Sequence, residues 1–279
     1  MKKNLLLSII IVVLISACNM PGAVTPFPLA VSEELVIENT PTAGPSGISV
    51  SFQNVNLVIP EGLASGATTE LIPAVNEESG GPWGVSPEYI MFTFTDYASP
   101  VGSFDATVQI YPAQEYAAVN PWAESSLTRL QAILADPSIP FTNDNLSTVP
   151  FNGAAEQHYA AQAKLINFNG GKGVRMISQY GQFPGKIINS NSFYHYEGLT
   201  DDGKYMVAAL LPLLIPLEST AENPDADGIP YPSDISDNAG ISAYYQGVTE
   251  KLNAASSESF QPSLSQLDAL IQSIMISAK

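Results

Sequence analysis

Residues 158–212 decide the fold: they read HYAAQAKLINF (158–168), NGGKG (169–173), VRMISQYGQ (174–182), a loop, SFYHYEGL (192–199), TDDGK (200–204) and YMVAALLP (205–212). Apolar and polar side chains alternate in these runs, which is typical of half-buried strands. Asn-Gly at 169–170 and Asp-Gly at 202–203 favour tight hairpin turns. Because strands joined by tight turns must be antiparallel, the stretch predicts a meander of about four strands. We expect one face of the meander to lie on a core and the other to face water.

The alternation also predicts which side chains share a face. In the first run, one face carries Tyr159, Ala161, Ala163 and Leu165, with Gln162 and Lys164 on the other. In the return run, one face carries Val174, Met176, Ser178 and Tyr180, opposed by Arg175, Ile177 and Gln179. Both runs therefore read as half-buried strands.

The rest of the chain contains further strand and helix patterns. Strands are expected at residues 48–52, 55–59, 89–95 and 106–111. Residues 64–84 are expected to be mostly loop, with Gly80-Gly81-Pro82 as a breaker. Leucines on one face predict helix over residues 113–135, where Pro121 marks a start or a break. Two amphipathic helices follow near the C-terminus, and Pro262 opens the second. This order predicts the α+β class, an antiparallel sheet with helices packed on it.

The N-terminus has the pattern of an export signal. Lys2 and Lys3 precede a short apolar run over residues 5–15, and small residues follow before Cys18. The run is too short for a comfortable membrane-spanning helix. An ordinary signal peptide with a chance cysteine would show the same pattern, but Cys18 is the only cysteine and lies at the expected cleavage point.

Ile15-Ser16-Ala17-Cys18 resembles the lipobox of bacterial lipoproteins. The resemblance implies that residues 1–17 are a signal peptide and that Cys18 becomes a lipidated N-terminus. Acyl chains on this cysteine would hold the protein to the extracytoplasmic face of a membrane or cell envelope. Residues 18–47, rich in Pro, Thr, Ala and Gly, are then expected to form a flexible tether, and residues 48–279 a single globular domain.

The composition limits the classes of partner. The chain has 27 acidic and 10 basic residues, and loss of Lys2 and Lys3 leaves 8 basic residues, a net charge of 8 − 27 = −19. Such a charge repels nucleic acid and anionic lipid. With Cys18 lipidated, no thiol is left for a disulfide, a metal site or a nucleophile.

The late acidic segment, residues 213–240, is expected to be a long loop with the spacing of a calcium site. Oxygen side chains stand at alternate positions before a glycine, with a fourth at the twelfth place: Asn223, Asp225, Asp227 and Asp234. This spacing resembles the calcium loop of EF-hands. It departs from that loop by Asn at the first position, Asp rather than Glu at the twelfth, and flanks without clear helices. Calcium binding and a solvated acidic loop both stay open.

Other candidate chemistry is sparse. The sequence has no G-x-S-x-G, H-E-x-x-H or Walker motif. His158 and His195 could join Glu197 in a metal or proton-transfer site, or they could be packing residues. Residues 170–173, GGKG, look like a phosphate cradle but lack the helix that would hold an anion.

Aromatic side chains gather around the meander. Tyr180, Tyr194 and Tyr196 could line a groove for an apolar or sugar ligand, or they could be core and cross-strand residues. A pair of carboxylates for glycoside hydrolysis is also open, because acidic residues are abundant.

Two segments carry a family resemblance. ISVSFQNVNLVIPEGLA (48–64) and LSQLDALIQSIMIS (264–277) resemble the start and end of PsbP-like domains, which are antiparallel α/β/α sandwiches. The segments at 171–182 and 196–212 look more like bacterial lipoproteins. These resemblances imply an α/β/α sandwich with a binding or accessory role.

The leading expectation is thus a lipid-anchored, non-enzymatic binding module without a cofactor, whose protein or small-molecule partner is unknown. A carboxylate-based hydrolase and a calcium-stabilised module are the alternatives.

Overall fold

The computed structural model describes residues 46–102, 104–149 and 155–277. The chain separates into two units, Met1–Thr42 and Ala43–Lys279, and every described residue belongs to the second. The expected signal peptide, Cys18 and nearly all of the expected tether lie outside the described residues. Within those ranges, no helix has both the length and the apolar character needed to cross a membrane.

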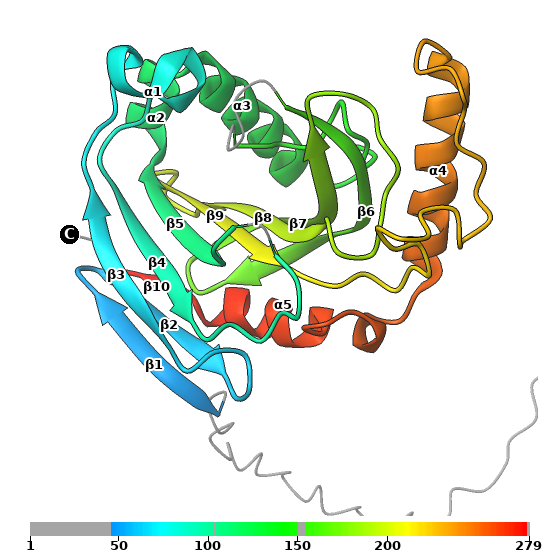
Figure 1. Cartoon of the computed structure of the whole chain (residues 1–279). Helices are drawn as coiled ribbons and strands as arrows, with labels where there is room; N and C mark the ends of the chain where they lie inside the picture. Colours follow the sequence, from blue (N-terminus) through cyan, green and yellow to red (C-terminus); the bar gives the residue numbers. More distant parts are fainter. Residues whose placement is uncertain (1–45, 103, 150–154, 278–279) are drawn as a thin grey trace, which may run out of the picture. The chain divides into compact units, whose positions relative to one another are not determined.

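A seven-stranded antiparallel sheet forms the centre of the second unit (Figure 1). Its strands lie in the order β3 (Gly66–Ile72), β4 (Tyr89–Thr95), β5 (Thr107–Pro112), β9 (Tyr205–Pro212), β8 (Phe193–Thr200), β7 (Gly171–Gly181) and β6 (Glu156–Phe168). Strands β6 to β9 pair with their neighbours in chain order, which confirms the predicted meander. The α+β class is confirmed as well.

Both predicted turns close hairpins of this meander. Gly170 joins β6 to β7 with a φ of 84°, and Gly203 joins β8 to β9 with a φ of 70°. Glycine adopts this left-handed backbone conformation without the steric cost that a Cβ would bring. The glycine-rich sequence at 170–173 therefore builds a hairpin between two strands.

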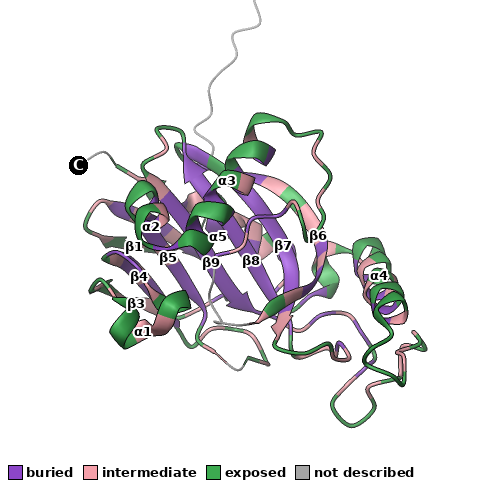
Figure 2. Cartoon of the chain, turned by 90° about the horizontal axis from the view of Figure 1, so that it is seen from above, coloured by how far each residue is buried: buried purple, intermediate pink, exposed green. Residues whose placement is uncertain are grey.

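Two groups of elements cover the two faces of the sheet. Helices α2 (Ala113–Val119) and α3 (Pro121–Ala135) pack on one face. The other face carries α5 (Leu264–Ser273) and a three-stranded sheet of β1 (Gly47–Phe52), β2 (Val55–Pro60) and β10 (Met275–Ile276). The central strands are accordingly buried along almost their whole length (Figure 2).

The expectation of one wet face was therefore wrong. In β8 every residue is buried, and in β9 all but Tyr205 are buried. The sequence of β9 is a nearly continuous apolar run, and such runs belong to strands that are covered on both faces.

The alternation predicted for the first strand was also wrong in its second half. Gln162 has a φ of 55° and lies in a β-bulge, where the pairing of β6 with β7 shifts by one residue. Tyr159 and Ala161 face the α5 side, but Ala163 and Leu165 face the α3 side. An extra residue in one strand inverts the phase of every side chain beyond it.

Residues 64–84 are more ordered than expected. They contain β3, which pairs along its whole length with β4, and helix α1 (Glu77–Gly84), which is kinked at Gly81, within the predicted breaker. β3 has few buried side chains, so its sequence carries a weak pattern, and pairing with β4 determines its conformation.

The predicted helices are present. The helix expected over 113–135 breaks at Pro121, where Asn120 caps α3 by accepting the backbone N–H groups of Trp122 and Ala123. After the long loop come α4 (Asn238–Ala254), a short 3₁₀ helix (Ser257–Ser259) and α5. The apolar side chains of α5 and of its C-cap are buried: Leu264, Leu267, Leu270, Ile271 and Ile274.

Candidate functional site

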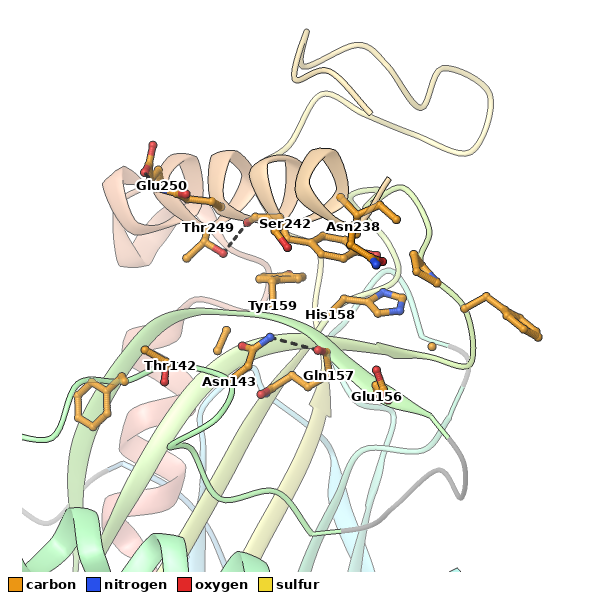
Figure 3. A pocket seen from close by; sticks show the side chains of 18 of the residues that line it. Thr142, Asn143, Glu156, Gln157, His158, Tyr159, Asn238, Ser242, Thr249 and Glu250 are labelled. Carbon is orange, nitrogen blue, oxygen red and sulfur yellow. Dashed lines mark hydrogen bonds between the residues drawn. The ribbon is translucent and has the colours of Figure 1, made fainter. Parts of the chain in front are cut away.

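A cleft lies between helix α4 and the edge strand β6 (Figure 3). It has a volume of about 590 Å³, within the range that small-molecule sites occupy. The floor comes from residues 156–160 of β6, and α4 forms the opposite wall. Residues 141–143 and 181–184 line the remaining sides.

Hydrogen bonds from the middle and from the C-terminal end of α4 fix this cleft. In the middle of the helix, the hydroxyl of Tyr244 accepts the backbone N–H of Ile187 at 2.7 Å, and that of Tyr245 accepts the N–H of Gly185 at 2.9 Å. At the C-terminal end, the amide of the bulge residue Gln162 reaches the last carbonyls of the helix. The bulge thus has a structural role, because its positive φ presents Gln162 to the end of α4.

The Gln162 side chain makes this second attachment with several bonds. Its Nε2 donates to the carbonyl of Leu252 at 2.8 Å and to that of Ala255 at 3.0 Å. Its backbone N–H donates to Oδ1 of Asn253 at 2.5 Å. The carbonyl of Leu252 also accepts the N–H of Ala255 at 3.1 Å, so Gln162 adds a second donor there and supplies a donor to the carbonyl of Ala255.

His158 stands on the floor of the cleft with its ring stacked on Tyr245. The ring centroids are 5.2 Å apart and the planes are inclined by 14°. Burial lowers the pKa of His158, and the backbone carbonyl of Phe183 offsets part of this shift. Burial also raises the pKa of Tyr245. The stacked pair is therefore a neutral, flat surface at neutral pH.

The rest of the lining mixes polar and apolar residues. The polar part is rich in amide and hydroxyl side chains: Thr142, Asn143, Gln157, Gln182, Asn238, Ser242, Gln246 and Thr249. Amides and hydroxyls both donate and accept hydrogen bonds. Glu156 and Glu250 also line the cleft, and they lie at opposite ends of it (Figure 3). Glu250 accepts a hydrogen bond from Gln246 at 2.8 Å.

A second cavity of about 410 Å³ adjoins the cleft. The two share Phe141, Ala160 and Thr249 in their linings. The smaller cavity is also lined by Lys164 and Arg175. The edge of β6 thus borders two adjoining spaces, and basic side chains line the smaller one.

The structure does not gather the predicted calcium residues around one point. Asp225 pairs with Lys186 at 2.6 Å, and an oxygen of Asp234 accepts the N–H and O–H of Ser236. Among the residues that the structure describes, no group of three or more His, Cys, Asp and Glu side chains could hold a metal ion. Calcium binding remains a prediction without a gathered site for Asn223, Asp225, Asp227 and Asp234.

Asp227 instead attaches the acidic loop to α4. Its nearly buried carboxylate accepts the backbone N–H of Ser219 at 2.7 Å and that of Glu218 at 3.2 Å, and it pairs with Lys251. Burial alone would raise the pKa of this carboxyl. The contacts with Lys251, Ser219 and Glu218 outweigh burial, so the pKa lies below its usual value.

Two of the three tyrosines considered for a groove are core residues. Tyr194 and Tyr196 are fully buried, and their hydroxyls donate to Oδ1 of Asp268 and to the carbonyl of Ile166. The groove expectation is therefore wrong for both, because the register of β8 turns them inward. Tyr180 is partly buried near the end of β7 and does not line the cleft.

The two histidines belong to different places. His195 and Glu197 are fully buried, with Nε2 of the histidine 3.1 Å from Oε1 of the glutamate. The same Oε1 accepts the backbone N–H of Val149. His158 lies in the cleft and contacts Tyr245, so the structure does not assemble the site of His158, His195 and Glu197.

Several residues of the site were not identified from the sequence. In the sequence, Gln162 falls on the predicted surface face of a strand. Tyr245 falls at a position that the sequence pattern assigns to the core side of a helix. Arg175 carried a signal: it shares a strand face with Ile177, which is a core residue. A charged residue in an inward register needs a partner, and this could have marked it as a site residue.

Comparisons with known proteins give no family for this chain. It matches no protein-family model, no curated protein and no solved structure. The resemblances to bacterial lipoproteins and to PsbP-like domains therefore stay predictions.

Proposed function

We propose that this protein is a lipid-anchored extracytoplasmic binding module that holds a small ligand in the cleft between α4 and β6. One observation supports the proposal most: an open cleft of ligand size joins a flat aromatic pair to a polar lining. Sites for small molecules combine apolar surface with a few polar groups in this way. The anchor at Cys18 would hold the module at a membrane surface.

The ligand that suits the cleft has one apolar face and a hydrogen-bonding edge. The ring stack of His158 and Tyr245 offers a flat surface for the apolar face. The surrounding amides and hydroxyls can pair with donors and acceptors alike. A mono- or disaccharide has this chemistry, since C–H groups form an apolar face of the sugar ring while hydroxyls project from its edge.

The position of the acids favours binding over hydrolysis. Glycoside hydrolysis needs two carboxyl groups on either side of one bond. Glu156 and Glu250 lie at opposite ends of the cleft instead of facing each other (Figure 3). Glu197 is fully buried, so no substrate contacts its carboxylate in this conformation.

A pair of tryptophan variants tests the proposal. Ser242 lines the cleft and Ala243, its exposed neighbour on α4, does not. Full-length protein in detergent is screened by differential scanning calorimetry against neutral mono- and disaccharides. A ligand at about 100 times its Kd stabilises the folded state by about 2.7 kcal/mol, and this raises the unfolding midpoint.

The wild-type protein and Ala243→Trp should show this rise with the same sugar, and Ser242→Trp should lose it. Absence of any rise in the wild-type protein, or an equal rise in both variants, would contradict the proposal.

A further inference from the structure

We propose that the smaller cavity beside the cleft is an oxyanion subsite, in which Arg175 binds a carboxylate or phosphate group of the ligand. The inference rests on the proposed function, because it assigns a charged group to the ligand of the adjoining cleft.

Arg175 is a buried cation, and two of its donor nitrogens lack a hydrogen-bond acceptor. Its side chain is 4% exposed, and it lines the smaller cavity. Its Nε and Nη1 have no hydrogen-bond acceptor among the described residues. A buried charge without hydrogen bonds is costly, so such a group requires an explanation. A ligand oxyanion would supply the acceptors, since guanidinium binds carboxylate and phosphate with two parallel bonds.

The nearest acid does not meet this need. Oδ1 of Asp268 lies 3.8 Å from Nη1 of Arg175, beyond hydrogen-bond distance. The same Oδ1 already accepts the hydroxyl of Tyr194 at 3.0 Å. Burial raises the pKa of Asp268, and the Arg175 charge offsets only part of that rise. Asp268 therefore lies close to Arg175 but accepts no hydrogen bond from Nε or Nη1.

The charge around the cavity also favours an anion. Lys164 and Arg175 both line it, and none of the described lining side chains is acidic. Lys164 is 60% exposed and lies 4.0 Å from Asp268, so its flexible chain can turn toward the cavity. The whole chain has a formal net charge of −17, which repels anions elsewhere. The two basic side chains at this cavity are therefore an exception to the acidic character of the chain.

The connection to the cleft defines the ligand class. Phe141, Ala160 and Thr249 line both spaces, so the two adjoin, and the proposed ligand extends across both. Such a molecule has a flat polyhydroxylated part and an acidic substituent, as in a uronic acid or a sugar phosphate. The neutral sugars of the first screen should accordingly bind more weakly than their acidic counterparts.

Nuclear magnetic resonance of arginine side chains tests the subsite directly. The chain contains two arginines, Arg129 and Arg175, so the Nε–Hε spectrum contains one signal from each. Arg129→Lys assigns the signals by removing one. Inorganic phosphate and acetate are titrated into full-length protein in detergent, with sodium chloride holding the ionic strength constant.

We expect the Arg175 signal to move with at least one anion while the Arg129 signal stays in place. A response to acetate alone identifies a carboxylate site, and a response to phosphate alone a phosphate site. Equal movement of both arginine signals, or no movement of the Arg175 signal with either anion, would overturn the inference.

Substitutions give a second measure. Arg175→Gln should weaken binding of the responding anion by about 10- to 100-fold, the value of charge-assisted hydrogen bonds. Lys164→Gln changes an exposed residue and should weaken binding by about two- to fivefold without affecting folding. Lys204→Gln, an exposed lysine outside both cavities, is the matched control. Equal affinities of Lys164→Gln and Lys204→Gln would count against the subsite.

The two proposals fail in different ways. An anion that moves the Arg175 signal equally in the wild-type protein and in Ser242→Trp supports the subsite even if no sugar binds the cleft. If a sugar binds the cleft but neither anion moves the Arg175 signal, the result supports the binding module and contradicts the anion subsite.

Discussion

Replacing Asp227 with alanine should lower the free energy of unfolding by about 1–4 kcal/mol. The carboxylate accepts the backbone N–H groups of Glu218 and Ser219 and pairs with Lys251. Its side chain is only 4% exposed, so alanine leaves the part-buried N–H of Ser219 without this acceptor, whereas the exposed N–H of Glu218 can bond to water. The first loss costs about 1–3 kcal/mol, and loss of the pair with Lys251, whose side chain is 41% exposed, adds at most about 1 kcal/mol.

Asp225→Ala is the matched control because it removes an acid from the same loop. Asp225 pairs with Lys186 but is 63% exposed, and exposed pairs contribute at most about 1 kcal/mol. Urea unfolding of both variants, followed by circular dichroism, gives the two free energies. Equal losses in the two variants would refute the reasoning from burial and hydrogen bonding.

The same measurement separates this role of Asp227 from calcium binding. The folded-state pKa of Asp227 lies below its usual value of 3.8, so its stabilisation is present above that pH and is lost as the pH falls through the folded pKa. Asp227→Ala should remove this part of the acid response. If calcium bound both acids, it would instead raise the wild-type midpoint, and Asp225→Ala and Asp227→Ala would both lose that rise.

Three further predictions follow from other contacts. Gln162→Ala should lower the free energy of unfolding by about 1–3 kcal/mol and speed amide hydrogen exchange in the last turn of α4, because the carbonyl of Ala255 loses its side-chain donor and that of Leu252 keeps only the N–H of Ala255; unchanged exchange there would contradict this role. Because burial lowers the pKa of His158, its contribution to stability is complete above pH 6.5 and declines as the pH falls toward the folded pKa. Unfolding curves between about pH 5 and 7 should show this decline, and His158→Phe should flatten it. Cys18→Ser should move the protein from the membrane fraction to the soluble fraction; unchanged fractionation would contradict the predicted lipid anchor.

The sequence was most informative where structure depends on local chemistry. The Asn-Gly and Asp-Gly turns and the alternation between them predicted the meander, because a hairpin needs only neighbouring residues. Pro121 likewise marked a helix start correctly, since a missing N–H is tolerated at the first helical position. Pro262 lies two residues before α5, whose N-cap is Ser263. The coverage of the second face could not be predicted, because it depends on α2 and α3 packing on strands that come much later in the chain.

The candidate site was hidden for the same reason. The cleft forms only when α4 packs beside β6, and Gln162 and Leu252, which join them, are 90 residues apart. The bulge at Gln162 had no signal in the alternation, because Ala163 and Leu165 are small or apolar and suit either face. The calcium spacing, in contrast, was visible in the sequence, but the acids of that loop took separate protein partners.

Helix α4 is bonded at its middle and at its C-terminal end beside an open cleft, and this arrangement has a kinetic consequence. The tyrosine hydroxyls hold the middle and Gln162 holds the end. A ligand that contacts both α4 and β6 must oppose detachment at either place, because detachment breaks part of its contacts. Local opening of the helix then sets how long the ligand stays bound. The dissociation rate and the exchange rate of the α4 amides should therefore change together when either attachment is weakened.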